Sequence, residues 1–157
     1  MRIMKFKEYL SAATLALSLM AGATAMAGDF GTAEEARAML ERAVVAVRDN
    51  KEAALKTFTE GGEGFKDRDL YVACFTQGKG KGVMTAHGGV AALVGKSGYD
   101  LIDKKGTNLG ELLNNDTAGE IRTVTYWWPR PGSDEPVEKQ SYYTTVGDQN
   151  CLVGFYK

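Results

Sequence analysis

The last third of the chain consists of strand-like segments with only turns between them. Glu120 to Trp128, Val137 to Val146 and Cys151 to Tyr156 are rich in β-branched and aromatic residues. Earlier in the chain, Leu70 to Phe75 and Val83 to His87 flank a glycine-rich turn and predict a hairpin. Strands that follow one another, rather than alternating with helices, predict an antiparallel sheet instead of a doubly wound parallel one.

A long amphipathic segment, Thr32 to Thr59, precedes these strands and predicts one helix. Thr32 and Glu35 form a capping box, in which each side chain accepts a hydrogen bond from the other residue's backbone amide. Apolar residues recur at steps of three and four and form one stripe, while charges of both signs take the other face. Gly61-Gly62 ends the helix, and Asp49-Asn50 marks either a kink or a break into two helices.

These segments together predict an α+β fold with an antiparallel five-stranded sheet. The long N-terminal helix packs on one face of the sheet. Gly88 to Asn115 holds short helical pieces and loops, which we expect to cover the other face. A ligand would lie between the sheet and these short helices.

Residues 1–27 have the three parts of a signal peptide. Arg2, Lys5 and Lys7 form a basic start, Leu10 to Ala23 is an apolar run, and Ala25-Met26-Ala27 supplies small residues at the cleavage site. The alternative is an uncleaved membrane anchor, but the run is shorter than the about 20 apolar residues that span a bilayer. The sequence therefore predicts a periplasmic or secreted product, residues 28–157, that forms a single domain.

The charge balance excludes a nucleic-acid-binding protein. The predicted leader contains three of the 19 basic residues and one of the 20 acidic residues. The mature chain keeps 16 basic and 19 acidic residues, so its formal net charge is −3. A protein that binds nucleic acid would show a basic face instead.

The sequence also lacks the motifs of common enzymes. His87 is the sole histidine, and no serine occupies a nucleophile elbow of the type G-x-S-x-G. The glycine-rich Gly78 to Gly82 lacks the pattern of a P-loop and precedes a strand. No second histidine or cysteine pair has metal-ligand spacing. We therefore expect a non-catalytic protein with no cofactor and no metal.

Two cysteines, Cys74 and Cys151, lie in predicted strands of the mature chain. An exported chain meets an oxidising compartment, so the pair predicts one disulfide bond. That bond requires the two strands to be neighbours. The alternative is two buried, unpaired thiols.

A set of short motifs occurs in order along almost the whole mature chain. The motifs are Phe65-x-Asp67-x-Asp69-Leu70-Tyr71-Val72, Ala86-His87-Gly88, Leu93-Val94-Gly95-Lys96, Tyr126-x-Trp128-Pro129, Lys139-x-x-Tyr142 and Val153-Gly154-Phe155-Tyr156. The ordered set resembles the single Cache domain, here in a stand-alone soluble form. The resemblance implies an extracytoplasmic, PAS-like sensor that binds small metabolites, often carboxylates, amino acids or amines. Most such domains belong to membrane receptors, so it also implies a membrane receptor or kinase as partner.

Aromatic residues and one lysine gather on two neighbouring strands and form the candidate ligand site. Tyr126 and Trp128 are two residues apart and share a face, whereas Trp127 points the other way. The resemblance favours Tyr126 and Trp128 facing the ligand; the alternative is that all three rings belong to the core. His87 enters the covering loop, where it either donates a hydrogen bond to a carboxylate or fixes the loop.

A cation on the fourth strand completes this candidate site. Lys139 lies across the turn from Trp128 and is expected to pair with a ligand carboxylate, unless it is an ordinary solvent-facing lysine. Tyr142 or Tyr143 would supply a hydroxyl group. Arg122 and Arg130 are alternative cations. The expected ligand-binding residues are thus His87, Tyr126, Trp128, Lys139, Tyr142 and Tyr143.

The sequence therefore predicts a periplasmic sensor that reversibly captures a small, anionic metabolite. The alternative is a structural or protein-interaction module in which the aromatic rings fill the pocket. In that case the N-terminal helix would form the surface for a homodimer or another partner.

Overall fold

The computed structural model describes residues 28–77, 82–113, 117 and 119–157. The predicted leader, residues 1–27, and most of the predicted hairpin turn, residues 78–81, lie outside the described residues. The strands are β1 (Lys66–Asp67), β2 (Leu70–Thr76), β3 (Met84–His87), β4 (Arg122–Pro129), β5 (Pro136–Val146) and β6 (Gln149–Tyr156). They form one antiparallel sheet in the order β1-β2-β6-β5-β4, with β3 also paired to β2.

The predicted α+β fold with an antiparallel sheet is confirmed, and the strand count differs by one. The extra strand is β1, which has only two residues and pairs with β2 through Lys66 and Asp67. A segment this short carries no alternation of apolar and polar residues, so the sequence contains no sign of it.

The predicted long helix is two helices, α1 (Ala33–Asp49) and α2 (Lys51–Glu60). Thr32 and Glu35 form the predicted capping box at the start of α1. Asn50 separates the helices because its backbone is extended, with φ −158° and ψ 95°. Its backbone N–H donates to Ala46 at the end of α1, and its side chain accepts from the Ala53 N–H at 3.1 Å. Asn50 therefore ends one helix and caps the next.

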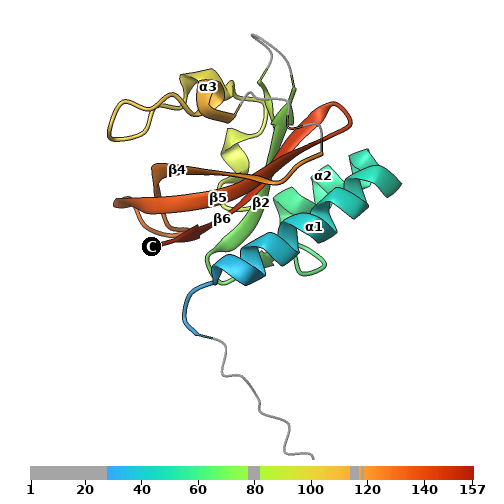
Figure 1. Ribbon diagram of the computed structural model, residues 1–157, viewed down its shortest axis with the longest axis horizontal. Helices are drawn as coiled ribbons and strands as arrows, with labels where there is room; N and C mark the ends of the chain where they lie inside the picture. The colour runs from blue at the N-terminus through green and yellow to red at the C-terminus, as the bar shows by residue number, and fades with distance from the viewer. Residues whose placement is uncertain (1–27, 78–81, 114–116, 118) are drawn as a thin grey trace, which may run out of the picture.

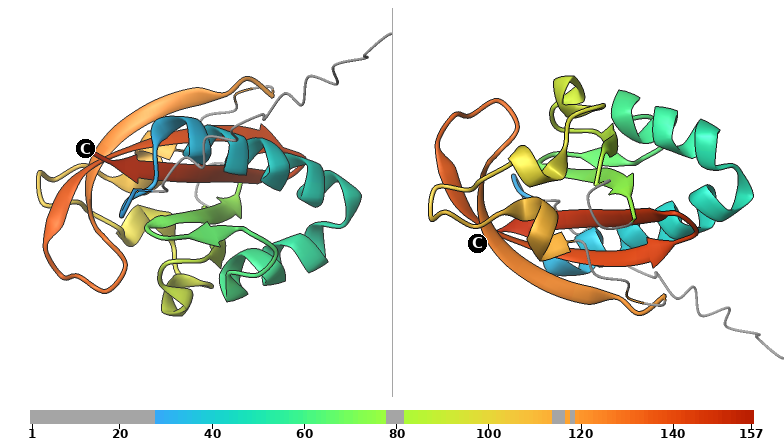
Figure 2. Two further views of the ribbon diagram at one scale, coloured as in Figure 1. Left: turned by 90° about the horizontal axis from the view of Figure 1, so that it is seen from below. Right: turned by 90° about the horizontal axis from the view of Figure 1, so that it is seen from above.

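Both of these helices pack on one face of the sheet (Figure 1). α1 crosses β6, β5 and β2, while α2 turns back over β2 and β3, so that the pair forms a V (Figure 2). Between helices and sheet lies a core of fully buried side chains that includes Met39, Leu40, Phe58, Val72 and Val153. None of the helices in the described residues has both the length and the apolarity that crossing a membrane requires.

Cys74 and Cys151 form a disulfide bond on this helix-facing side of the sheet. The two residues lie directly opposite each other in the pairing of β2 with β6, and their Cα atoms are 4.1 Å apart. Both are fully buried in the core between helices and sheet. The predicted bridge between neighbouring strands is thus confirmed.

The other face of the sheet is covered by η1 (Ala91–Leu93), η2 (Gly98–Asp100) and α3 (Leu109–Leu113), with the loops between them. Figure 1 shows α3 on the side of the sheet opposite α1 and α2. A second apolar cluster lies under this cover and includes Phe75, Met84, Leu109, Leu113 and Leu152. The predicted cover of short helices is therefore present, and the candidate site lies beneath it.

Candidate functional site

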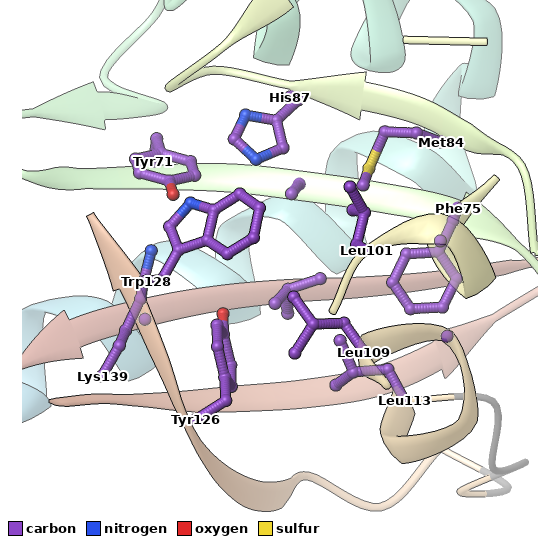
Figure 3. Close-up of a pocket in the computed structure, with 15 residues that line it drawn as sticks. Tyr71, Phe75, Met84, His87, Leu101, Leu109, Leu113, Tyr126, Trp128 and Lys139 are labelled. Carbon is purple, nitrogen blue, oxygen red and sulfur yellow. The ribbon is translucent and has the colours of Figure 1, made fainter. Parts of the chain in front are cut away.

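A narrow cavity lies between the sheet and the short helices η2 and α3 (Figure 3). Its volume is about 30 Å³, measured as the space open to the centre of a water molecule. A water needs about 10–15 Å³ on this measure, so the cavity suits a ligand of very few non-hydrogen atoms. One end is apolar and is walled by Phe75, Met84, Leu101, Leu109 and Leu113. The opposite end is polar.

The polar end brings together residues from four different strands. Tyr71 comes from β2, His87 from β3, Tyr126 and Trp128 from β4, and Lys139 from β5. Tyr126 and Trp128 share this face because successive strand residues point to opposite sides, as predicted. Their ring centroids are 6.5 Å apart in an edge-to-face arrangement. Figure 3 shows the five side chains directed toward one another.

Lys139 supplies a positive group at the polar end, although it is almost entirely shielded from solvent. Its side chain is 1% exposed, and Nζ lies 4.0 Å from the centre of the Tyr71 ring and 4.7 Å from that of Tyr156. Nζ also donates a 3.4 Å hydrogen bond to the Tyr156 hydroxyl. Among the described residues, no carboxylate lies within 4.0 Å of Nζ. Burial lowers the pKa of Lys139 to about 7, against the opposing effect of the negative charge on Asp69.

His87 is held as a neutral hydrogen-bond donor beside this lysine. Its Nδ1 accepts a 2.8 Å hydrogen bond from the Val90 N–H, so the ring proton of the neutral form lies on Nε2. Burial and the positive charge of Lys139 lower the pKa of His87 to about 4. The ring contacts Tyr71, with centroids 4.9 Å apart, and faces Trp128 at 6.4 Å. His87 therefore fixes the covering loop and lines the cavity with the same ring.

Hydrogen bonds fix the tyrosine hydroxyls around the cavity. Tyr126 pairs with Ser141 at 2.9 Å, and burial raises the pKa of Tyr126 to about 12 despite this bond. The Tyr156 hydroxyl donates to the Pro129 carbonyl at 2.7 Å. Burial also raises the pKa of Tyr71. The tyrosines at this end therefore remain neutral at physiological pH.

Gly154 makes room for the lysine. It lies opposite Ser141 in the pairing of β5 with β6, where a Cβ atom would collide with the Lys139 Cε and the Ser141 Oγ. The stem of Lys139 thus runs across the bare backbone of β6. Neither this glycine nor Tyr71 was expected at the site. Both occur in the motifs that carry the family resemblance, but only the strand register brings them under Lys139.

The loop that covers the cavity is tied to β4 by Asp103. Its carboxylate accepts hydrogen bonds from the backbone amides of Lys105 and Thr107, both at 2.8 Å, and from that of Trp127 at 3.0 Å. Burial raises the pKa of Asp103, but these backbone hydrogen bonds outweigh it and leave the pKa below its usual value. Lys104 and Lys105 lie over the Trp127 ring, with Nζ 3.8 and 4.5 Å from its centre. Trp127 therefore binds the covering loop through its ring and its backbone N–H, and its ring does not line the cavity.

The two remaining predicted tyrosines do not line the cavity. Tyr143 is buried on the same face of the sheet, within the second apolar cluster. Tyr142 faces the helices, where the Arg37 guanidinium lies 5.9 Å from its ring and the Phe155 ring 6.1 Å. Lys139 and Tyr142 are three residues apart on one strand, so they point to opposite faces. The structure thus removes Tyr142 from the candidate site.

Neither alternative cation takes the place of Lys139. Arg130 pairs with the buried carboxylate of Asp69 at 3.3 Å and lies over the rings of Phe30 and Tyr156. Arg122 is exposed and pairs with Glu120 at 3.4 Å. In the described part of the chain, no group of histidine, cysteine, aspartate or glutamate side chains is arranged to hold a metal ion.

An outer groove adjoins the polar end of the cavity. It has a volume of about 320 Å³ on the same measure and is lined by Gly89, Val90 and residues 129–134, together with Tyr71 and Trp128. Tyr71 and Trp128 line both spaces and therefore form the wall between them.

Most of the sequence matches a known domain family. Residues 32–155 match the profile of the Cache domain. This range includes the whole sheet except Tyr156, the last residue of β6, and it includes the five residues from β2, β3, β4 and β5 at the polar end. No curated protein matches the sequence.

Several solved structures share the fold. A methyl-accepting chemotaxis protein from Vibrio parahaemolyticus RIMD 2210633 is 22% identical, with a TM-score of 0.63 over 78% of this chain and 86% of that chain. The periplasmic sensor domain of a chemotaxis protein is 22% identical, with a TM-score of 0.60 over 78% and 88%. A Cache chemosensory domain solved for carboxylic acid recognition is also 22% identical, with a TM-score of 0.58 over 78% and 86%. At this identity the likeness shows the fold.

Proposed function

Because the chain belongs to the Cache domain family, we propose that it is a sensor domain that reversibly binds a small monocarboxylate in the cavity beside Lys139. The observation that carries this proposal is the burial of the Lys139 ammonium group with no carboxylate of the described residues within 4.0 Å of Nζ. An isolated buried cation is costly, and an anionic ligand would relieve that cost through a charge-assisted hydrogen bond. One structural neighbour is a Cache domain solved for carboxylic acid recognition, which supports the same ligand class.

The surroundings of Lys139 define how the carboxylate would bind. One carboxylate oxygen accepts from Nζ of Lys139, and the other is within the part of the cavity where His87 presents its Nε2–H. The aromatic rings of Tyr71 and Trp128 exclude water and strengthen these interactions. Binding without covalent chemistry requires nothing further, so we propose a non-catalytic role.

The opposite end of the cavity selects the rest of the ligand. Phe75, Met84, Leu101, Leu109 and Leu113 offer only apolar surface there. None of the described residues that line the cavity is acidic, so a ligand ammonium group would be buried without a partner. This arrangement favours a short aliphatic acid over amino acids, amines and dicarboxylates.

We further propose that the protein is exported and reports to a membrane receptor or kinase. The leader-like residues 1–27 support export, and the disulfide bond between Cys74 and Cys151 suits an oxidising compartment. Mass spectrometry of the protein recovered from the producing cells tests the first part. A mature chain that begins at Gly28 is expected, and a retained leader would contradict it.

A ligand screen tests the binding proposal. Isothermal titration with acetate, propionate and butyrate at pH 6 is expected to show one site, while propylamine, alanine and succinate bind at least tenfold more weakly. Lys139→Met is expected to abolish binding. Lys96→Met is the matched control, because Lys96 is exposed and outside the cavity.

The outcome of this ligand screen distinguishes a ligand-binding sensor from an interaction module. Binding by none of the acids would overturn the proposal and favour an interaction module that uses the exposed face of α1. Equal loss of binding in the two lysine variants would show that general charge, rather than the cavity, attracts the acids.

A further inference from the structure

We propose that the cavity binds a carboxylate together with one proton, which Lys139 takes up as the anion enters. This inference rests on the proposed function and concerns the chemical species that the site recognises. The site would then respond to the product of anion and proton concentrations, which is proportional to the concentration of the undissociated acid. The same amount of carboxylate would therefore occupy more sites in a more acidic medium.

The geometry of Lys139 makes the neutral amine the favoured form in the unliganded protein above about pH 7. Nζ lies between the rings of Tyr71 and Tyr156, and its hydrogen-bond partner is the neutral Tyr156 hydroxyl at 3.4 Å. The cation–π attraction of the two rings favours the charged form. Complete burial without a carboxylate opposes the charge more strongly, and burial lowers the pKa of Lys139 to about 7.

The charged groups nearest to Lys139 are already engaged with each other. Asp69 precedes β2 and raises the pKa of Lys139 through its negative charge. Its Oδ2 accepts from Arg130 at 3.3 Å, and its Oδ1 accepts from the Gly31 N–H at 2.7 Å. The carboxylate of Asp69 is therefore held by other donors and does not form an ion pair with Lys139 within 4.0 Å.

The other titratable groups that face Lys139 keep one protonation state across the relevant range. His87 on β3 is neutral above pH 5, because burial and the charge of Lys139 lower its pKa to about 4. Burial raises the pKa values of Tyr71 on β2, Tyr126 on β4 and Tyr156 on β6 above their usual value. Between pH 6 and pH 9, Lys139 is thus the group at this end of the cavity that changes charge.

Binding of an anion reverses the preference of Lys139. A carboxylate within about 3 Å favours the ammonium form and raises the pKa of Lys139 toward or above its ordinary value. The difference between the two pKa values is the coupling between anion and proton. Above about pH 7, the dissociation constant for the anion is expected to rise about tenfold per pH unit. Below that pH it is expected to level off.

Calorimetry of propionate binding to the mature chain measures the proton directly. Titrations at pH 8 in phosphate and in Tris give observed enthalpies that differ by the number of protons taken up times the difference between the ionisation enthalpies of the two buffers. Propionate itself stays ionised, because such carboxyl groups titrate near about pH 4–5. The expected uptake is close to one proton at pH 8 and falls toward zero at pH 6. The affinity is expected to drop about tenfold between pH 8 and pH 9.

Two variants identify the group that takes up the proton. Lys139→Arg carries a permanent charge, so any binding that remains is expected to show no proton uptake at pH 8. His87→Gln is expected to change the affinity but to keep the uptake near one proton. Loss of the uptake in His87→Gln, with its retention in Lys139→Arg, would assign the proton to the histidine and overturn the inference.

If Lys139→Arg does not bind propionate, the titrations of the wild-type protein alone still test whether a proton is taken up. Binding at pH 8 with equal enthalpies in both buffers and no change in affinity up to pH 9 would overturn proton uptake but leave the proposed function intact. No binding at any pH would instead overturn the proposed function.

Discussion

At the scale of the residue, Lys139 lowers the stability of the unliganded fold while supplying the positive charge that is proposed to bind a carboxylate. Its pKa is lower in the folded chain, at about 7, than its ordinary value of 10.5. Between these two values the unfolded chain binds more protons than the folded chain, so the contribution of Lys139 to the free energy of unfolding rises with pH. Below about pH 7 the full cost of the buried charge is present.

This cost predicts that Lys139→Met stabilises the unliganded protein. Replacing a buried, unpaired charge with an apolar side chain of similar length is expected to raise the free energy of unfolding by about 1–4 kcal/mol at pH 6. The gain is expected to shrink toward pH 9.5, where the lysine is already neutral in the folded chain. Urea unfolding of the wild type and of Lys139→Met at pH 6, 8 and 9.5 measures this gain in the free energy of unfolding. A loss of stability at pH 6 would show that Lys139 is already neutralised by a partner in the fold.

Gly154 is the second residue on which the polar end depends. Gly154→Ala is expected to displace Lys139, because the new Cβ would meet its Cε and the Ser141 Oγ. We expect propionate binding to weaken at least tenfold and the free energy of unfolding to fall by about 1–3 kcal/mol. Calorimetry and urea unfolding give the two values.

A second glycine provides the matched control for this substitution. At Gly62, a Cβ would lie 3.4 Å from the nearest atom, the Thr57 Cγ2, which is an ordinary contact. Gly62→Ala is expected to leave propionate binding unchanged. Unchanged binding in Gly154→Ala as well would mean that the lysine reaches the ligand by another path.

The sequence predicts some residues of the site but not others, and the difference has a physical reason. Tyr126 and Trp128 follow from the two-residue period of a strand, which holds whatever the fold. The same period, counted from Lys139, places Tyr142 on the opposite face, so the expectation that Tyr142 lines the site was wrong on this ground alone. Tyr71 and Gly154 depend on the register between strands far apart in the chain, and a single sequence does not contain that register.

At the scale of the element, the junction of α1 and α2 depends on one side chain. Asn50→Ala removes the hydrogen bond from the Ala53 N–H to the side-chain oxygen and is expected to lower the free energy of unfolding by about 1 kcal/mol. Asn50→Asp keeps an acceptor there and is the control, with an expected change of a few tenths of a kcal/mol. Urea unfolding at pH 7 checks both. Equal losses in the two variants would mean that backbone conformation, rather than the cap, is responsible.

The elements differ in how well the sequence predicts them. The strands β2, β4, β5 and β6 have enough β-branched and aromatic residues to be recognised individually. The helix break at Asn50 was one of two alternatives, because the apolar stripe continues across it and only the cap geometry distinguishes a kink from a break. Strand β1 escapes prediction because its two residues are stabilised by their pairing with β2.

At the scale of the whole molecule, the sheet separates a face covered by the two long helices from the face on which we propose that the ligand binds. The face covered by α1 and α2 holds the larger core and the disulfide bond. The other face holds the cavity beneath short helices that Asp103 ties to β4. This division was predicted from the order of helices and strands, since one amphipathic helix covers one face and the chain between strands must cover the other.

The division predicts that stability and binding respond differently to loss of the disulfide bond. Replacing both Cys74 and Cys151 with alanine removes a disulfide bond that joins residues 77 positions apart in the sequence. We expect this loss to lower the free energy of unfolding by about 2–5 kcal/mol. The bond lies on the helix side of β2 and β6, whereas Lys139 and Tyr71 contact each other on the opposite side. Propionate affinity at pH 6 and 15 °C is therefore expected to change less than twofold.

Reduction of the wild-type protein provides the control for this comparison. A reducing agent is expected to lower the stability of the wild type and to leave the double alanine variant unchanged, because the variant has no disulfide bond to reduce. Urea unfolding and calorimetry on the same samples give stability and affinity together. A loss of affinity as large as the loss of stability would show that β2 and β6 transmit strain through the sheet, and the two faces would then have to be treated as one cooperative unit.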